Sequence, residues 1–176
     1  MIVEDLRYPI GRFKAVRDLS ASDRKTLIAQ IAAAPNEVRK AVAGMNDVQL
    51  DTPYRDGGWT VRQVVHHLAD SHMNAYIRFK LAVTEEHPTI KPYDETAWAR
   101  LPEAAGAPVD ISLDLLESLH RRWVMFLDDL KPEDFRRTVN HPENGTMTLE
   151  TILQLYAWHG RHHVAHITSL RKRKGW

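Results

Sequence analysis

The stretch "TLETILQLYAWHGRHHVAHITSLRKRKG", Thr148–Gly175, has the pattern of a long amphipathic helix. Thr148 is a typical N-cap, and Gly175 can adopt the left-handed conformation that ends a helix. Apolar residues recur every three or four positions and therefore gather on one face. Because such a face must be covered, the stretch predicts one helix of a bundle. The residues of the face are Ile152, Leu155, Tyr156, Ile167 and Leu170.

Three other stretches predict helices of similar length. The first, Ser22–Gly44, contains Pro35, which should kink or divide it. The second, Thr60–Glu85, opens with a T-x-x-Q capping box. The third is capped by Ser112 and ends near Leu130, before Lys131-Pro132. The expected fold class is all-α, an antiparallel four-helix bundle whose long connections could permit a crossover.

The longest connection, His87–Asp110, contains four prolines, which discourage regular structure. Loops of this length are often lids or walls of a functional site. The connection before the last helix carries the turn signal "ENGT", Glu143–Thr146.

Composition limits the possible functions. The chain of 176 residues is expected to form one domain, residues 1–176, with a real core. Its net charge of +1, from 24 basic and 23 acidic residues, argues against binding nucleic acid or membranes through bulk charge. The absence of cysteine excludes disulfides, thiolate ligands and a cysteine nucleophile. With no signal-peptide pattern and no membrane-length apolar run, we expect a soluble, cytoplasmic protein.

Four of the ten histidines lie in "HGRHHVAH", His159–His166. On a helical wheel, His159 and His163 lie within about 30° of the apolar axis, whereas His166 and His162 lie about 50° and 90° away. Imidazoles at i and i+4 can bind one ion, and hydrogen-bonded histidines at the edge of the core are an equally good interpretation. His162 looks like a rim residue, and His166 like a supporting or core histidine.

The second predicted helix contains "HHLADSH", with His66, His67 and His72. By periodicity His72 points into the apolar stripe, His67 lies on its flank, and His66 points away. Periodicity alone therefore favours His72 as a third ligand. The face of His67 is polar and suits a cavity wall; it carries Ser71, Asn74 and Arg78.

With these residues placed, the chain resembles the DinB-like superfamily, and within it the YfiT type of metal-dependent hydrolase. The matching segments are "YPIGRF", the stretch from Leu50 to Trp98 that includes "GGWTVRQVVHHLADSHMNAYIRF", and "YAWHGRHHVAHITSLRKRKGW". Together with the lengths between them, they extend over nearly the whole chain. The resemblance implies an antiparallel four-helix bundle, a homodimer, and one divalent ion per subunit. Zn²⁺ is the expected ion and Ni²⁺ the alternative, although three histidines also accept cobalt or iron(II).

The resemblance also implies the ligands. In the family, a histidine eight residues after the tryptophan that opens the second helix joins an i, i+4 pair on the fourth helix. Counted from Trp59, this gives His67, and "HGRHH" gives His159 and His163. On this basis His67 replaces His72 as the expected third ligand, and His72 becomes a supporting residue.

Three neutral histidines leave coordination positions open, which is typical of catalytic rather than structural sites. "HGRHH" has glycine where H-E-x-x-H zinc proteases carry their glutamate base, so protease chemistry is not supported. No acid clearly replaces it. Asp70 is a weak candidate for a base or supporting group, and Arg78 and Arg161 for holding an anionic group; ordinary surface positions are the simpler interpretation of all three.

Three functions remain open. The first is a metal-dependent hydrolase, with water activated at the ion. The second, also implied by the resemblance, is a metal-dependent thiol S-transferase that uses a low-molecular-weight thiol such as bacillithiol or mycothiol on small electrophiles. The third is a metal-stabilised bundle or metal sensor without catalysis. A small-molecule substrate is the expected partner in the first two; the sequence identifies neither the substrate nor the catalytic base.

Overall fold

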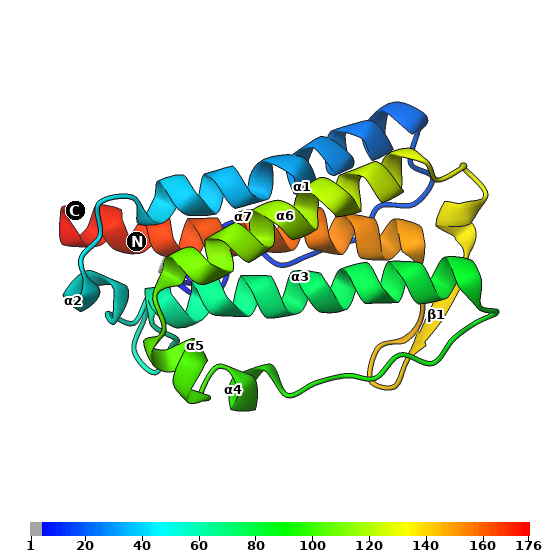
Figure 1. Cartoon of the computed structure of the whole chain (residues 1–176). Helices are drawn as coiled ribbons and strands as arrows, with labels where there is room; N and C mark the ends of the chain where they lie inside the picture. Colours follow the sequence, from blue (N-terminus) through cyan, green and yellow to red (C-terminus); the bar gives the residue numbers. More distant parts are fainter. Residues whose placement is uncertain (1–4) are drawn as a thin grey trace.

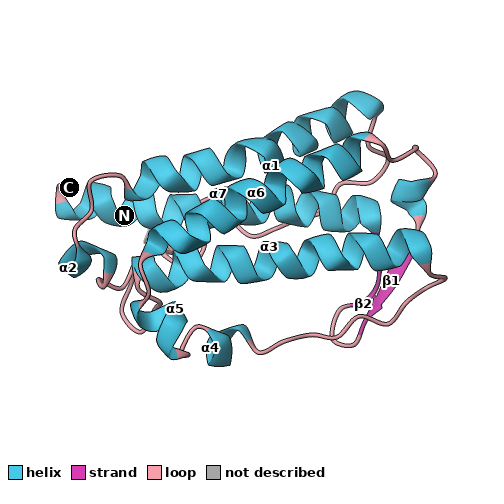
Figure 2. Ribbon diagram, in the orientation of Figure 1, coloured by secondary structure: helices cyan, strands magenta, loops and turns pink. Residues whose placement is uncertain are grey.

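The computed structural model describes residues 5–176, and four long helices form its body (Figure 1). These are α1 (Ala21–Val42), α3 (Val61–Thr84), α6 (Val109–Asp128) and α7 (Leu149–Lys174). The predicted four-helix bundle is confirmed. The shorter elements are α2 (Asp47–Leu50), α4 (Glu95–Trp98), α5 (Pro102–Gly106), the 3₁₀ turn η1 (Asp134–Arg136), and a hairpin of β1 (Thr138–His141) and β2 (Gly145–Thr148) (Figure 2).

The directions of the four helices are mixed. Helices α1 and α7 run the same way, because Arg24 pairs with Glu150 near their N-terminal ends and Arg171 donates to the Ala41 carbonyl near their C-terminal ends. Helices α3 and α6 also run the same way, joined by the long crossover of residues 85–108 (Figure 1). The expected antiparallel arrangement holds for α1 with α6 and for α3 with α7.

The interior of the bundle is apolar at both ends, with an unusual number of histidines in it. One cluster contains the fully buried Trp123 and Phe79, and the other contains Val64 and Leu116. Burial of this apolar surface is the main stabilising contribution to the bundle. The buried histidines are His66, His67, His72, His120, His162, His163 and His166.

Most of the predicted helix ends are confirmed. Thr60 and Thr148 cap α3 and α7, and Gly175 ends α7 with φ of 71°. The predicted cap at Ser112 is wrong: α6 begins at Val109 after Pro108, and Ser112 lies within it. Pro35 was predicted to kink or divide the first helix, and division is wrong because α1 continues through it.

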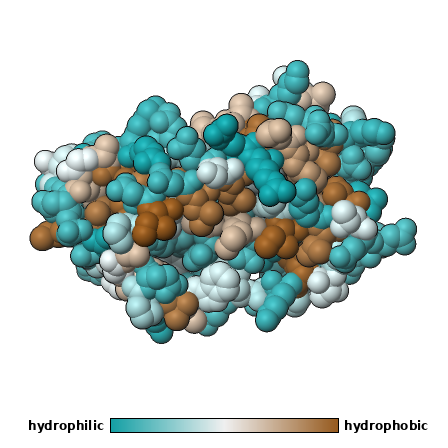
Figure 3. Space-filling view, viewed as in Figure 1, coloured by the Kyte–Doolittle hydropathy of each residue, from teal (hydrophilic) through white to brown (hydrophobic). Residues whose placement is uncertain are grey.

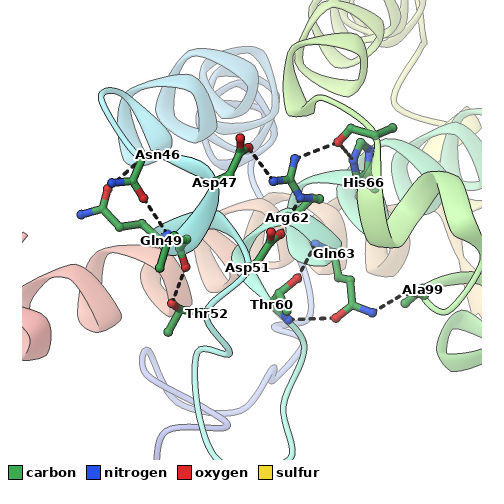
Figure 4. A network of polar contacts seen from close by, with 12 residues as sticks. Asn46, Asp47, Gln49, Asp51, Thr52, Thr60, Arg62, Gln63, His66 and Ala99 are labelled. Atoms are coloured by element: carbon green, nitrogen blue, oxygen red, sulfur yellow. Dashed lines mark hydrogen bonds and ion pairs between the residues drawn. The ribbon is translucent and has the colours of Figure 1, made fainter.

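The crossover is more regular than its prolines suggest, because it contains α4 and α5. Its position is fixed by Arg62 in the first turn of α3 (Figure 4). The buried guanidinium of Arg62 donates to Asp51 at 2.6 Å, to Asp47 at 2.8 Å and to the carbonyl of Ala107 at 3.0 Å. One side chain thus joins α2 and the end of the crossover to the start of α3.

Two further segments lie against the bundle. The turn signal Glu143–Thr146 falls in the hairpin, where Gly145 has φ of 71°. The N-terminal arm runs along α7. The Val16 N–H donates to the side-chain oxygen of Gln154 at 2.8 Å, and the Val16 carbonyl accepts from the side-chain nitrogen of Gln154 at 3.0 Å. Among residues 5–176, no helix has both the length and the apolar character needed to cross a bilayer.

Candidate metal centre

Three histidine side chains from α3 and α7 converge. One ring nitrogen from each of His67, His159 and His163 lies within 4.8 Å of the other two, and the Nε2 atoms of His67 and His159 are 3.3 Å apart. Two nitrogens that share a tetrahedral ion at about 2.1 Å lie about 3.4 Å apart. The donor set and its spacing therefore fit one divalent ion.

Helix geometry brings the three rings together. His159 and His163 lie one turn apart on α7, which runs antiparallel to α3 and its His67. Gly160 lets α7 approach α1 closely, because a Cβ atom there would lie only 3.2 Å from the Cβ of Ala34. The glycine in "HGRHH" therefore faces the neighbouring helix and not the histidine cluster.

Burial keeps the three imidazoles neutral. It lowers the pKa of His67 to about 4, with a smaller contribution from the nearby His162. It also lowers the pKa values of His159 and His163 well below their usual range, helped by the neighbouring imidazoles. Since the neutral ring is the form that binds metals, the cluster is ready to bind an ion at neutral pH.

The cluster opens onto a pocket of about 380 Å³. Both long connections contribute to its walls, a role that loop length predicted for the crossover alone. The crossover supplies Tyr93 and Glu95, and the hairpin supplies His141 and Glu143. The other lining residues are Trp59, His67, Ser71, Arg78, Pro92, Asn144, Leu155, Tyr156, Trp158, His159, His162 and His163.

Charged groups in the pocket include two that the sequence analysis missed. Glu95 and Glu143 lie on connections expected to be irregular, and loop length was the only signal for them. Burial raises the pKa of Tyr156, and the charge of Glu95 adds a much smaller contribution in the same direction. Arg78 lies 3.4 Å from the Tyr156 hydroxyl and forms no ion pair within residues 5–176.

Two candidates from the sequence lie outside the pocket. Asp70 is half-buried on α3, where burial and the charge of Glu103 raise its pKa, and it is not among the lining residues. Arg161 is exposed and donates to the carbonyl of Ala157 on its own helix. Neither side chain lines the pocket.

His162 and Trp158 form one wall of the pocket. The His162 ring is only 7% exposed and stacks on Trp158 with ring centroids 4.2 Å apart. The expected rim position of His162 agrees with its place in the lining, although the ring is more buried than a rim residue. Trp158 lines the pocket as well.

The remaining histidines surround the cluster or point away from it. His66 contacts the Ser112 hydroxyl at 2.7 Å and the Ala107 carbonyl at 3.1 Å, away from the cluster. His72 contacts Nδ1 of His159 at 3.1 Å, and His166 contacts Nδ1 of His163 at 3.3 Å. The supporting positions expected for His72 and His166 agree with these contacts.

Comparison with known proteins gives consistent matches. The family model described as DinB superfamily matches residues 30–167. Relatives from Bacillus cereus (strain 03BB102) and Bacillus thuringiensis subsp. konkukian (strain 97-27), both named "Putative metal-dependent hydrolase", are 59% identical over 174 residues, 99% of this chain and 100% of theirs.

Two solved structures share the fold. YfiT from Bacillus subtilis, described as a probable metal-dependent hydrolase with an unusual four-helix bundle topology, superimposes with a TM-score of 0.95. It is 52% identical, and the match includes 97% of this chain and 98% of YfiT. The four-helix bundle protein TT2238 is 18% identical and superimposes with a TM-score of 0.55. The match includes 87% of this chain and 99% of TT2238, and it shows the fold alone.

Proposed function

The chain belongs to the DinB superfamily, and from that premise we propose that it is a metal-dependent hydrolase acting on a small molecule. His67, His159 and His163 hold its one divalent ion. The observation that carries the proposal is the convergence of their ring nitrogens within 4.8 Å on the wall of a pocket. A donor set that faces a pocket leaves room for water and substrate, as in catalytic sites.

A divalent ion bound here supplies a Lewis acid and lowers the pKa of water. The side chains of the pocket shield the cluster from water and bind the substrate. Trp59 packs against His67 with ring centroids 4.6 Å apart and shields that side of the cluster from bulk water. The guanidinium of Arg78 holds an anionic group of the substrate, because no carboxylate among residues 5–176 pairs with it.

Glu95 is the proton acceptor that the motif lacks. Glu95 is the first residue of α4 and lines the same pocket as His159 and His163. A carboxylate in this position can take a proton from attacking water and return it to the leaving group. Glu95 would thus replace the glutamate of H-E-x-x-H from a different element.

We propose further that zinc is the resident ion and that nickel can replace it. We also propose that the protein is cytoplasmic and that residues 1–176 form a single domain. A His₃ set suits zinc, and metal availability decides between it and nickel. We also propose a homodimer through α6, which exposes Ile111, Leu115 and Met125. Figure 3 shows apolar residues along the middle of the face where α6 lies.

The alternative is a thiol S-transferase that uses a low-molecular-weight thiol as cosubstrate. The absence of cysteine is compatible with it, because the reactive sulfur would come from the cosubstrate. A thiolate is stabilised at a divalent ion, and the aromatic wall of Trp158 suits a small apolar electrophile. The two reactions need the same ion and differ in the nucleophile.

Metal analysis tests the centre itself. Purified protein is expected to carry about one divalent ion per chain, and His163→Ala is expected to lose it, because two imidazoles hold an ion far more weakly than three. The matched control is His66→Ala, another buried histidine, which should keep the ion. Equal metal content in wild type and His163→Ala would refute the assignment.

Activity panels separate the functions. Metal-loaded protein is expected to hydrolyse members of an ester and amide panel, and chelation should abolish this. Turnover of monobromobimane only when a thiol is supplied would favour the transferase. Failure of both panels with metal-loaded protein would indicate a metal-binding protein without catalysis.

A further inference from the structure

A continuous series of imidazoles leads from the cluster to the opposite side of the bundle. Nδ1 of His159 lies 3.1 Å from Nε2 of His72, and Nδ1 of His72 lies 2.7 Å from Nε2 of His120. Nδ1 of His120 then lies 2.6 Å from the carbonyl oxygen of Ile31 on α1. These contacts, here called the imidazole chain, connect all four long helices.

The carbonyl at its end fixes every proton in the imidazole chain. A carbonyl only accepts, so His120 must donate from Nδ1, which leaves its Nε2 as an acceptor. His72 must then donate from Nδ1 and accept at Nε2, and His159 must donate from Nδ1. The one tautomer of His159 that satisfies the chain carries its lone pair on Nε2, the atom 3.3 Å from Nε2 of His67.

Pro35 explains why this carbonyl is available. In a regular helix, the Ile31 carbonyl would accept from the N–H of residue 35, but proline has no N–H. A buried carbonyl without a partner is costly, and His120 provides the missing donor. Pro35, which was expected to kink or divide the first helix, therefore leaves the acceptor on which the imidazole chain ends.

The second ligand on α7 is held in the same way. Nε2 of His166 lies 3.2 Å from the carbonyl oxygen of Arg7, so His166 donates there and its Nδ1 is an acceptor. That acceptor lies 3.3 Å from Nδ1 of His163. His163 therefore donates from Nδ1 and, like His159, keeps its lone pair on Nε2.

We propose that His72, His120 and His166 are positioning residues that fix His159 and His163 in the tautomer able to bind the ion. This inference rests on the metal centre of the proposed function. Water cannot easily replace these contacts, because His72 is 0%, His120 1% and His166 3% exposed. Groups that hold the second nitrogen of a ligating histidine typically change metal affinity about 10–100-fold.

The tautomers can be measured without metal. Long-range ¹H–¹⁵N spectra of the metal-free wild type at neutral pH are expected to show Nδ1–H for His159, His72, His120 and His163, and Nε2–H for His166. A resolved Nε2–H tautomer of His159 or of His163 would overturn the inference. This result does not depend on whether the protein is a hydrolase.

Metal affinity provides the second measurement, by competition with a chelator for Zn²⁺. His120→Leu removes the acceptor for His72 and is expected to raise the dissociation constant about 10–100-fold, although His120 does not touch the cluster. His120→Gln places an amide oxygen where Nε2 was and is expected to restore most of the affinity. The matched control is His66→Leu, which loses two buried hydrogen bonds elsewhere on α3 and should bind like wild type.

The outcomes separate the two proposals. If the wild type binds no divalent ion, the proposed function fails, and the tautomers still decide the inference. If the wild type binds Zn²⁺ and His120→Leu binds it equally well, the positioning role fails and the metal centre stands. Should His120→Leu not fold, the tautomers of the wild type decide the inference by themselves.

Discussion

Individual histidines in this chain differ mainly in what their two ring nitrogens contact. One ring nitrogen of His163 contacts His166, and the other is free to bind an ion at the cluster. Both ring nitrogens of His66 contact groups outside the site. Both rings are 7% exposed, so burial alone does not separate a ligand from a structural histidine. The contacts of each ring nitrogen distinguish a metal ligand from a structural histidine.

At the same scale, Glu95→Gln tests the proton acceptor. The amide cannot accept a proton, so kcat for any ester or amide that is hydrolysed should fall about 100-fold. KM and metal content should change little, because Glu95 is not a ligand. Steady-state kinetics with metal analysis measure both.

Glu103→Gln is the control for that variant. It lies on α5, the next short helix of the crossover, and does not line the pocket. Its kcat should match that of wild type. An unchanged kcat in Glu95→Gln would mean that another group accepts the proton.

At the scale of elements, the approach of α7 to α1 decides what "HGRHH" can do. The Cβ of any residue at position 160 points toward Ala34, and its next neighbour is the His72 ring at 3.7 Å. A glutamate placed there would enter the contact between two helices. The missing glutamate is therefore a packing requirement as well as a chemical difference from the proteases.

Gly160→Glu, which completes an H-E-x-x-H motif, is accordingly expected to destabilise the protein and to give no peptidase activity. Overpacking costs about 1–3 kcal/mol, and an unpaired buried carboxylate adds to it. The melting temperature and a peptide-cleavage assay measure the two effects.

Gly160→Ala is the matched control. It gains about 1 kcal/mol of helix propensity, which offsets mild crowding against Ala34. Its stability should lie near that of wild type. A stable Gly160→Glu protein would show that α7 can move away from α1 at low cost.

At the scale of the whole molecule, the buried histidines link stability to pH. Burial lowers the pKa of His120 to about 4, although its bond to the Ile31 carbonyl opposes the shift, and the unfolded value is about 6.5. Between these values the unfolded chain binds a proton that the folded protein does not. The folded state is thus favoured above about pH 6.5, and this advantage is lost as pH falls toward 4.

We therefore expect the free energy of unfolding of metal-free protein to fall steeply below about pH 6.5. His120→Gln removes one group that binds a proton on unfolding. The slope of its free energy of unfolding against pH should therefore be smaller at pH 5, by up to about 1.4 kcal/mol per pH unit. Urea unfolding at several pH values measures the slopes. Parallel curves for the two proteins would mean that His120 is not buried as a neutral ring.

The sequence by itself determined the four long helices, the caps at Thr60 and Thr148, and the inward direction of His159 and His163. Helical periodicity and capping are local properties, so nearby residues are enough to predict them. The expectation for His67 came from resemblance to a family. Periodicity favoured His72, because a helical wheel orders side chains by their angle from the apolar face. It gives no information on a pocket at the flank of a helix.

Only the tertiary structure decided the mixed helix directions, the walls formed by the crossover and hairpin, and the partners of each histidine. It placed Glu95 in the pocket and showed that Pro35 leaves a carbonyl for His120. These features depend on contacts between residues far apart in the chain, such as His120 and Ile31, 89 positions apart. Local patterns specify which face of a helix is buried, and packing alone specifies what that face meets.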